Sequence, residues 1–240
     1  MKILGVETSS SVAGCGICDD KRLLCENNLY NTKTHSQIIM PMIDRMLSDC
    51  SMTLADIDVF AVNVGPGSFT GLRIGAATVK GFANALEKPV IGVSSLEVLA
   101  YNAVHSNMLI CPMIDARCDQ CYTALFESDG RKLTPIIKDT AMYVKEICET
   151  VASFEQDVLF LGDGSLIYRE LIESIVGDNA VFAHGHALEF RASSLCALAY
   201  EKVQNGEEQK GEKIVPVYLR KPQAQRELER RMKENDSNRK

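Results

Sequence analysis

The stretch that decides the fold is residues 65–75, which read Gly-Pro-Gly-Ser-Phe-Thr-Gly-Leu-Arg-Ile-Gly. An apolar run at 58–64 precedes it and predicts a buried strand, and small apolar residues at 74–86 predict a helix. Ser68 or Thr70 is placed to cap that helix. Such a turn can bind an anion through free N–H groups, or its glycines can serve packing alone. The spacing matches neither common glycine-rich phosphate motif, so both interpretations stay open.

Composition and charge indicate an ordinary globular protein. The chain has 240 residues, is 46% hydrophobic and carries a formal net charge of −6. Residues 220–240 hold eight Lys or Arg and four Asp or Glu, so this tail is +4 and residues 1–219 are −10. An acidic body argues against extended nucleic-acid binding by the body. The basic tail can contact phosphate or can be a solvated end.

The N-terminus and the cysteines indicate the compartment. A charged residue, Lys2, stands too early for a signal peptide, and no run of 18 apolar residues predicts a membrane span. Nine cysteines without a secretory signal favour reduced thiols. We therefore expect a cytoplasmic protein that does not associate with a membrane.

The two halves of the chain repeat one pattern. Residues 2–7 predict a strand that ends in the carboxylate Glu7, and residues 108–115 predict one that ends in Asp115. A short turn and a hairpin follow in both halves, which indicates a duplication. The pattern predicts an α/β fold of the actin, sugar kinase and Hsp70 (ASKHA) type. We expect an N-terminal lobe at 1–105, a C-terminal lobe at 106–219 and a basic helical tail at 220–240.

In that architecture the two carboxylates face a phosphate and metal site between the lobes. The predicted cleft residues are Glu7, Thr8, Asp115, Gly162 and Gly164. The first turn, 8–11, has no glycine, lysine or arginine, so a nucleotide site there lacks its usual charge complement. We expect a vestigial cleft and no cofactor. An independent actin-like ATPase or kinase is the alternative, because fold analogy alone does not define function.

The cysteines do not predict a metal site. Cys15/Cys18 and Cys118/Cys121 have the pair spacing of zinc ligands, but the pairs lie in different halves. Cys15 and Cys18 also fall in a predicted strand, where their side chains point to opposite faces. No metal is expected, and a metallopeptidase is the least supported class.

Two predicted helices carry more apolar surface than one sheet can cover. The helix at 35–49 has apolar residues on more than one stripe, and the helix at 71–86 is rich in glycine and alanine. Side by side they could form half of a four-helix interface with a partner. The predicted interface residues are His35, Ile38, Ile39, Met42, Ile43, Met46, Ser68, Phe69, Gly71, Leu72, Gly75, Ala76 and Val79. Alternatively, the chain's own second lobe covers both faces.

Three motifs resemble the bacterial TsaB (YeaZ) family: residues 3–9 (Ile-Leu-Gly-Val-Glu-Thr-Ser), 64–75 and 216–220 (Pro-Val-Tyr-Leu-Arg). The likeness runs over essentially the whole chain. It implies an actin-like fold and a non-catalytic role in forming N6-threonylcarbamoyladenosine in tRNA. It also implies pairing through the first lobe with the catalytic paralogue TsaD, joint engagement of the ATPase TsaE, tRNA contact through the complex, and a homodimer when the chain is alone. The HxxxH metal pair of TsaD is missing from this sequence.

Overall fold

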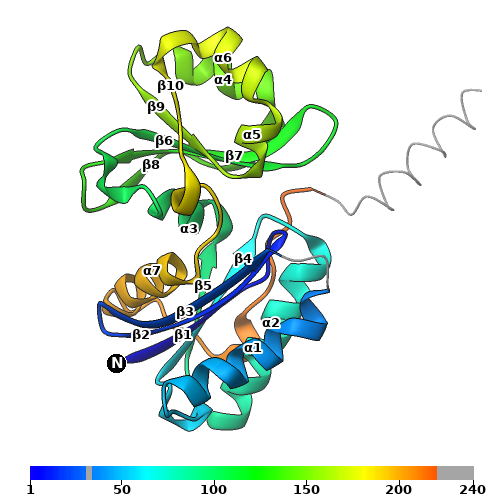
Figure 1. Ribbon diagram of the computed structural model, residues 1–240, viewed down its shortest axis with the longest axis vertical. Helices are drawn as coiled ribbons and strands as arrows, with labels where there is room; N and C mark the ends of the chain where they lie inside the picture. The colour runs from blue at the N-terminus through cyan, green and yellow to red at the C-terminus, as the bar shows by residue number, and fades with distance from the viewer. Residues whose placement is uncertain (31–33, 221–240) are drawn as a thin grey trace, which may run out of the picture.

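The structure is a computed structural model that describes residues 1–30 and 34–220 (Figure 1). Two five-stranded sheets form its framework. The first has the order β3-β2-β1-β4-β5, from β1 (Lys2–Glu7), β2 (Val12–Asp19), β3 (Arg22–Tyr30), β4 (Val59–Gly65) and β5 (Val90–Ser94). The second has the order β10-β9-β6-β7-β8, from β6 (Leu109–Asp115), β7 (Gln120–Ser128), β8 (Leu133–Tyr143), β9 (Val158–Leu161) and β10 (Ala180–Phe182).

The two sheets share one connectivity. In each sheet the first strand pairs antiparallel with the hairpin strand that follows it, β1 with β2 and β6 with β7. The same strand pairs parallel with the strand that follows the next helix, β1 with β4 and β6 with β9. The duplication predicted from the sequence is therefore confirmed.

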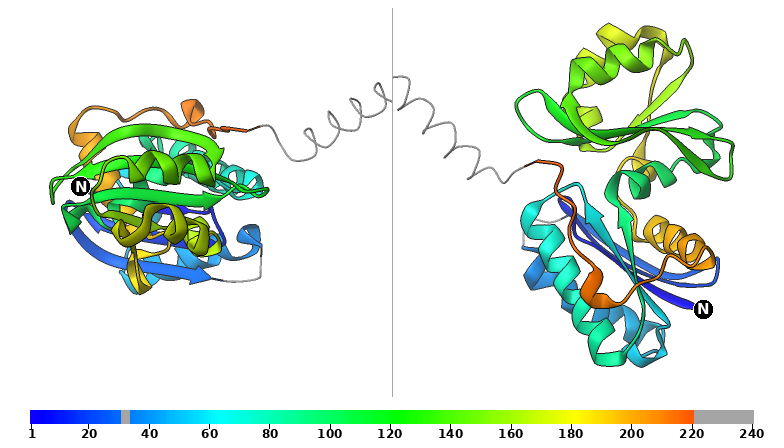
Figure 2. Two further views of the ribbon diagram at one scale, coloured as in Figure 1. Left: turned by 90° about the horizontal axis from the view of Figure 1, so that it is seen from above. Right: turned by 180° about the vertical axis from the view of Figure 1, so that it is seen from behind.

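Helices cover the outer faces of the two sheets (Figures 1 and 2). On the first sheet these are α1 (His35–Asp49) and α2 (Phe69–Leu86), and on the second α4 (Val144–Ala152) and α6 (Arg169–Val176). The short α5 (Asp163–Ile167) follows β9. Single 3-10 turns occur at Leu54–Asp56, Val104–Ser106, Gly177–Asn179, Gly185–Ala187 and Gly211–Lys213. None of the described helices is long and apolar enough to cross a membrane.

Two helices between the sheets are exchanged between the halves of the chain. α3 (Ser95–Tyr101), which ends the first half, packs chiefly on β6, β7 and β8, whereas α7 (Ala192–Gln204), which ends the second half, packs on β1 and β2. A Cβ atom on Gly5 would lie 2.8 Å from Sγ of Cys196, and one on Gly16 would lie 3.2 Å from Cβ of Ala192. Glycine at these strand positions lets α7 approach the sheet closely.

The lobe boundaries differ from the predicted ones at the end of the chain. The sequence predicts one lobe for 106–219, but α7 and the segment after it return to the first sheet. Gln209 forms a bridge with Val90 of β5, and the Val217 N–H donates to the Val64 carbonyl at 2.6 Å. Helical periodicity shows that a helix has a buried face, but it does not show which sheet buries that face. Apart from Arg220, the predicted tail lies outside the described residues.

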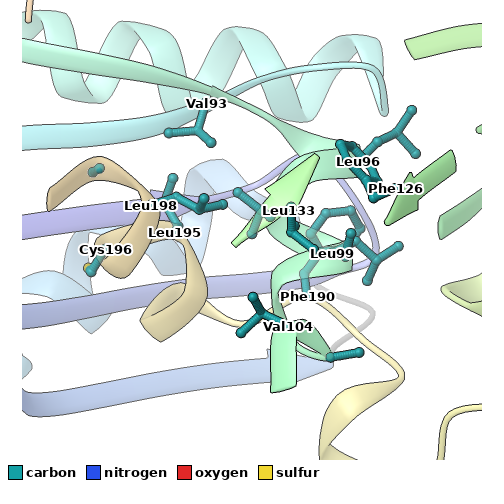
Figure 3. Close-up of a cluster of buried hydrophobic side chains, with 14 of the residues drawn as sticks. Val93, Leu96, Leu99, Val104, Phe126, Leu133, Phe190, Leu195, Cys196 and Leu198 are labelled. Carbon is teal, nitrogen blue, oxygen red and sulfur yellow. The ribbon is translucent and has the colours of Figure 1, made fainter. Parts of the chain in front are cut away.

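One hydrophobic core is continuous through the middle of the molecule (Figure 3). It contains Val93 of β5, Leu99 of α3, Phe126 of β7 and Leu198 of α7, each at most 5% exposed. Separate clusters lie under α1 and α2 and under α4 and α6. Pulling the two sheets apart would expose the central cluster to water, so hydrophobic burial holds the lobes together.

Substituting glycine tests the close approach of α7. We expect Gly5→Ala to lower the free energy of unfolding by about 1–3 kcal/mol, because the added Cβ overlaps Cys196 in a packed core. The control is Gly81→Ala on the exposed side of α2, where an added Cβ meets no atom within 4 Å. Because alanine favours helix over glycine, this variant should raise the free energy of unfolding by up to ~1 kcal/mol. Urea unfolding measures both effects. If Gly5→Ala were as stable as the unmodified chain, α7 would not lie this close to the sheet.

Candidate functional site

A cavity of about 660 Å³ opens between the two lobes, at the carboxyl ends of β1, β4 and β6. Its first-lobe wall is the turn after β1 and the start of α2, and its second-lobe wall is the end of β6 with the following loop. The lining residues are Ser9, Ser10, Ser11, Gly67, Ser68, Phe69, Thr70, Ile114, Asp115, Ala116, Arg117, Tyr122 and Asp163.

Glu7 lies behind this cavity and does not line it. Its side chain is fully buried, and Oε1 accepts bonds from both the N–H and the hydroxyl of Ser9 at 2.6 Å. The Asn63 amide donates to Oε2. Burial raises the pKa of Glu7 to about 7, although the Ser9 bonds favour the charged form. The structure therefore gives Glu7 a role in joining β1, β4 and the first turn.

Three more of the predicted cleft residues hold neighbouring elements of the chain together. The Thr8 hydroxyl is buried and donates to the Gly71 carbonyl at 2.8 Å, which fixes the start of α2 against the first turn. Gly162, with φ +92°, lies against the Met113 carbonyl, and a Cβ on Gly164 would lie 3.0 Å from the same oxygen. These glycines allow α5 to start close to β6.

Asp115 is the one predicted cleft residue that lines the cavity. Its Oδ1 accepts bonds from the Tyr168 hydroxyl at 2.8 Å and from the Arg117 N–H at 2.9 Å. The Asp115 N–H donates to Asp163 Oδ1 at 3.0 Å. Burial raises the pKa of Asp163, and burial together with the bond to Asp115 raises the pKa of Tyr168. The two carboxylates thus tie the end of β6 to α5.

The lining of the cavity carries more acidic than basic side chains. Its first-lobe wall offers serine hydroxyls and the N-terminus of α2 but no lysine or arginine, and its second-lobe wall carries Asp115 and Asp163 against Arg117 alone. A polyphosphate without a bound cation would therefore meet two carboxylates and one guanidinium, an excess of negative charge. Within residues 1–30 and 34–220, no group of three or more His, Cys, Asp or Glu is placed to hold a metal ion.

Ser68, one of the two predicted caps, starts α2 by accepting a bond from the Gly71 N–H at 3.2 Å. Thr70 is exposed within the first turn of the helix. His35 begins α1, and its Nε2 lies 2.7 Å from the Ser10 carbonyl. The first turn after β1 therefore holds the N-terminal ends of both outer helices in place.

Most of the predicted interface residues are buried in the chain's own outer core. They pack on the outer face of the first sheet, beneath α1 and α2. The buried members are Ile38, Ile39, Met42, Ile43, Met46, Gly71, Leu72, Gly75, Ala76 and Val79. His35 and Phe69 are half-buried and Ser68 is exposed. The apolar residues that α1 carries beyond one stripe do not form a free surface, because α1 packs both on the first sheet and against α2. The alternative, that the chain's own second lobe covers both faces, holds only in part. Residues 211–218 of the predicted lobe 106–219 pack against α2, whereas α1 packs on the first sheet and on α2.

Sequence reasoning missed a cluster on the flank of α2. The Phe69 and Tyr218 rings stack with centroids 3.9 Å apart, and Arg73 Nε donates to the Tyr218 hydroxyl at 3.1 Å. A shallow groove of about 320 Å³ beside them is lined by Phe69, Thr70, Arg73, Ile74 and Ala77. The motif at 216–220 signalled this contact, but the sequence alone did not place it on the first lobe.

Two sheets of one connectivity, joined by a shared core and separated by a cleft, define the two-lobed actin-like (ASKHA) class of α/β proteins. The family model described as TsaD, tRNA N6-adenosine threonylcarbamoyltransferase, matches residues 28–228. The tRNA threonylcarbamoyladenosine biosynthesis protein TsaB of Bacillus subtilis (strain 168) is 33% identical, over 94% of this chain and 96% of the relative. The protein of the same name from Escherichia coli (strain K12) is 29% identical, over 95% and 98%.

A solved structure of YeaZ from Pseudomonas aeruginosa superposes with a TM-score of 0.78 at 26% identity, over 91% of this chain and 99% of the other. The chain therefore belongs to the TsaB (YeaZ) family. The family predicted from the sequence motifs is confirmed.

Replacing Glu7 tests its buried, hydrogen-bonded position. The pKa of Glu7 is raised from 4.5 to about 7, so its stabilising contribution is complete below pH 4.5 and is lost as the pH rises through 7. Glu7→Gln stays neutral at every pH, and its amide can bond a rotated Asn63 side chain. We expect the free energy of unfolding of the variant to exceed that of the unmodified chain by about 1–3 kcal/mol at pH 8 and by much less at pH 5. Urea unfolding at both pH values, with the exposed Glu127→Gln as control, measures this. A larger loss of stability at pH 8 than at pH 5 would contradict the raised pKa.

Proposed function

We propose that this chain is a non-catalytic subunit of the machinery that forms N6-threonylcarbamoyladenosine in tRNA. Family membership carries the proposal, since the Bacillus subtilis relative is named for the biosynthesis of this nucleoside and matches nearly the full length. In this proposal the chain scaffolds the catalytic paralogue TsaD, engages the ATPase TsaE with it, and reaches tRNA through the complex. By itself, in the cytoplasm, it is a homodimer.

The chemistry of the cleft supports a scaffolding role. Glu7 is buried behind Ser9, and Asp115 is bonded to Tyr168 and Arg117. Both carboxylates that the fold places near a phosphate site are therefore used to hold the chain together. A subunit that contributes binding surface needs a rigid framework at these positions, and internal hydrogen bonds supply it.

The exposed side of α1 and α2 is the docking surface that we propose in place of the buried stripes. This surface, called the outer helical face, consists of Ser36, Gln37, Met40, Pro41, Asp44, Arg45 and Ser48 of α1 and Thr70, Arg73, Ala77, Gly81 and Asn84 of α2. The Met40 side chain is 47% exposed and offers an apolar contact. Ala77 and Gly81 have small or no side chains, so another helix can approach α2 closely there. His35, Ser68 and Phe69, the predicted interface residues that are not buried, lie at its edge.

A reconstituted assay tests this function. We expect a mixture of TsaD, TsaE, ATP, threonine-derived donor and tRNA to form the modified nucleoside only when this chain is added. Ala77→Asp places a charge on the outer helical face without touching the core and should weaken capture of TsaD by about tenfold or more. Lys138→Asp, exposed on β8 of the second lobe, is the matched control.

Two outcomes would contradict the proposed function, and a third would contradict the docking surface. Full modification without this chain would remove it from the machinery. Tight binding of Mg-ATP with turnover by the isolated chain, measured by titration calorimetry and phosphate release, would favour the alternative of an independent actin-like ATPase or kinase. Equal loss of TsaD capture in Ala77→Asp and Lys138→Asp would move the docking surface away from the outer helical face.

A further inference from the structure

The last described segment of the chain, residues 214–220, links the two lobes on the side of the cleft. We call this segment the strap; it follows the flank of α2 in Figure 2. Ile214, 1% exposed, anchors it in the outer core of the first lobe, and the Val217 N–H donates to the Val64 carbonyl at 2.6 Å. At its far end, Arg220 Nη1 donates to the Ala116 carbonyl of the second lobe at 2.8 Å.

The middle of the strap is fixed to the N-terminal end of α2. Tyr218 stacks on Phe69 with an angle of 2° between the rings, and its hydroxyl accepts the bond from Arg73. The Arg73 guanidinium also lies 5.5 Å from the Phe69 centroid and 5.9 Å from the Tyr218 centroid, within cation–π range. All three side chains belong to the surface of the first lobe, outside the central core.

The loop that receives Arg220 has an unusual backbone. Arg117, Cys118 and Asp119 have φ of 63°, 56° and 55°, a left-handed conformation that residues with a Cβ rarely adopt in succession. The loop is closed by the Ala116 N–H, which donates to the Gln120 carbonyl at 2.9 Å, and by the Gln120 N–H, which donates to the Arg117 carbonyl at 3.3 Å. Such a conformation persists only where its surroundings fix it.

We propose that the strap is a latch that couples the N-terminal end of α2 to the loop 116–120. The central core joins the lobes behind the cleft, and the strap joins them in front of it. Contacts made at Phe69, Arg73 and Tyr218 then set how firmly Arg220 holds Ala116, and so how far the loop and the cleft open. The N-terminal end of α2 and the loop 116–120 are then two separate regions joined by one connecting segment. The latch is a property of the isolated chain and does not rest on the proposed function.

Hydrogen–deuterium exchange of the full-length chain tests the latch. Within the described residues, the ring and hydroxyl of Tyr218 interact with Phe69 and Arg73 of the first lobe, so we expect an effect of Tyr218→Ala on the second-lobe loop to travel through the strap. We expect Tyr218→Ala and Arg220→Ala each to speed exchange of the Ala116 and Gln120 amides about three- to tenfold. Amides of β6 next to the central core should be unchanged in both variants.

Two matched variants separate the latch from general damage. Val215→Ala alters a strap side chain that is 63% exposed and should leave loop exchange unchanged. Tyr218→Phe keeps the stacked ring and should retain most of the protection. Unchanged loop exchange in both Tyr218→Ala and Arg220→Ala would overturn the latch. A response to Arg220→Ala alone would overturn the coupling to α2. If Tyr218→Ala failed to fold, Tyr218→Leu, which also removes the stacked ring, would take its place, and unchanged loop exchange in that variant would overturn the coupling.

Discussion

The fold depends on the exchange of α3 and α7 between the two sheets. Each sheet has an inner apolar face that its own half of the chain does not cover, and the helix from the other half covers it. Gly5 and Gly16 allow α7 to lie against β1 and β2, and the side chains of both helices merge into one cluster. Because apolar burial is the main stabilising term of folding, neither half can complete its core without the other.

The shared core also determines the cleft. It brings the ends of β1, β4 and β6 to the same cleft, and the first turn then positions the starts of α1 and α2 through Ser9, Ser10 and Thr8. The carboxylates at the ends of β1 and β6 accept hydrogen bonds from other residues of the chain. Burial raises the pKa of Glu7 although its bonds with Ser9 favour the charged form, so this carboxyl group is shielded from solvent as well as hydrogen-bonded.

The sequence predicts much of this architecture because strand periodicity, hairpin turns and capping residues are local signals. The repeated strand and carboxylate pattern led to the two sheets, and Ser68 was one of the two predicted caps. The outer helices show where local signals fail. Ile38, Met42 and Met46 are apolar because both the first sheet and α2 bury α1. The sequence of a helix does not show how many neighbouring elements will pack against it. Placing α7 on the first sheet, or Tyr218 on Phe69, required contacts between residues far apart in the chain.

The most direct test of the shared core is native-state hydrogen exchange of Leu99→Ala. Leu99 stands on α3, is fully buried in the central cluster, and packs between elements of both halves. If the sheets share one core, the substitution lowers the opening free energy of the slowest amides in β2 and in β9 by the same amount, about 2–5 kcal/mol. Loss of protection in β9 with β2 unchanged would show two independent lobes and would contradict the shared core.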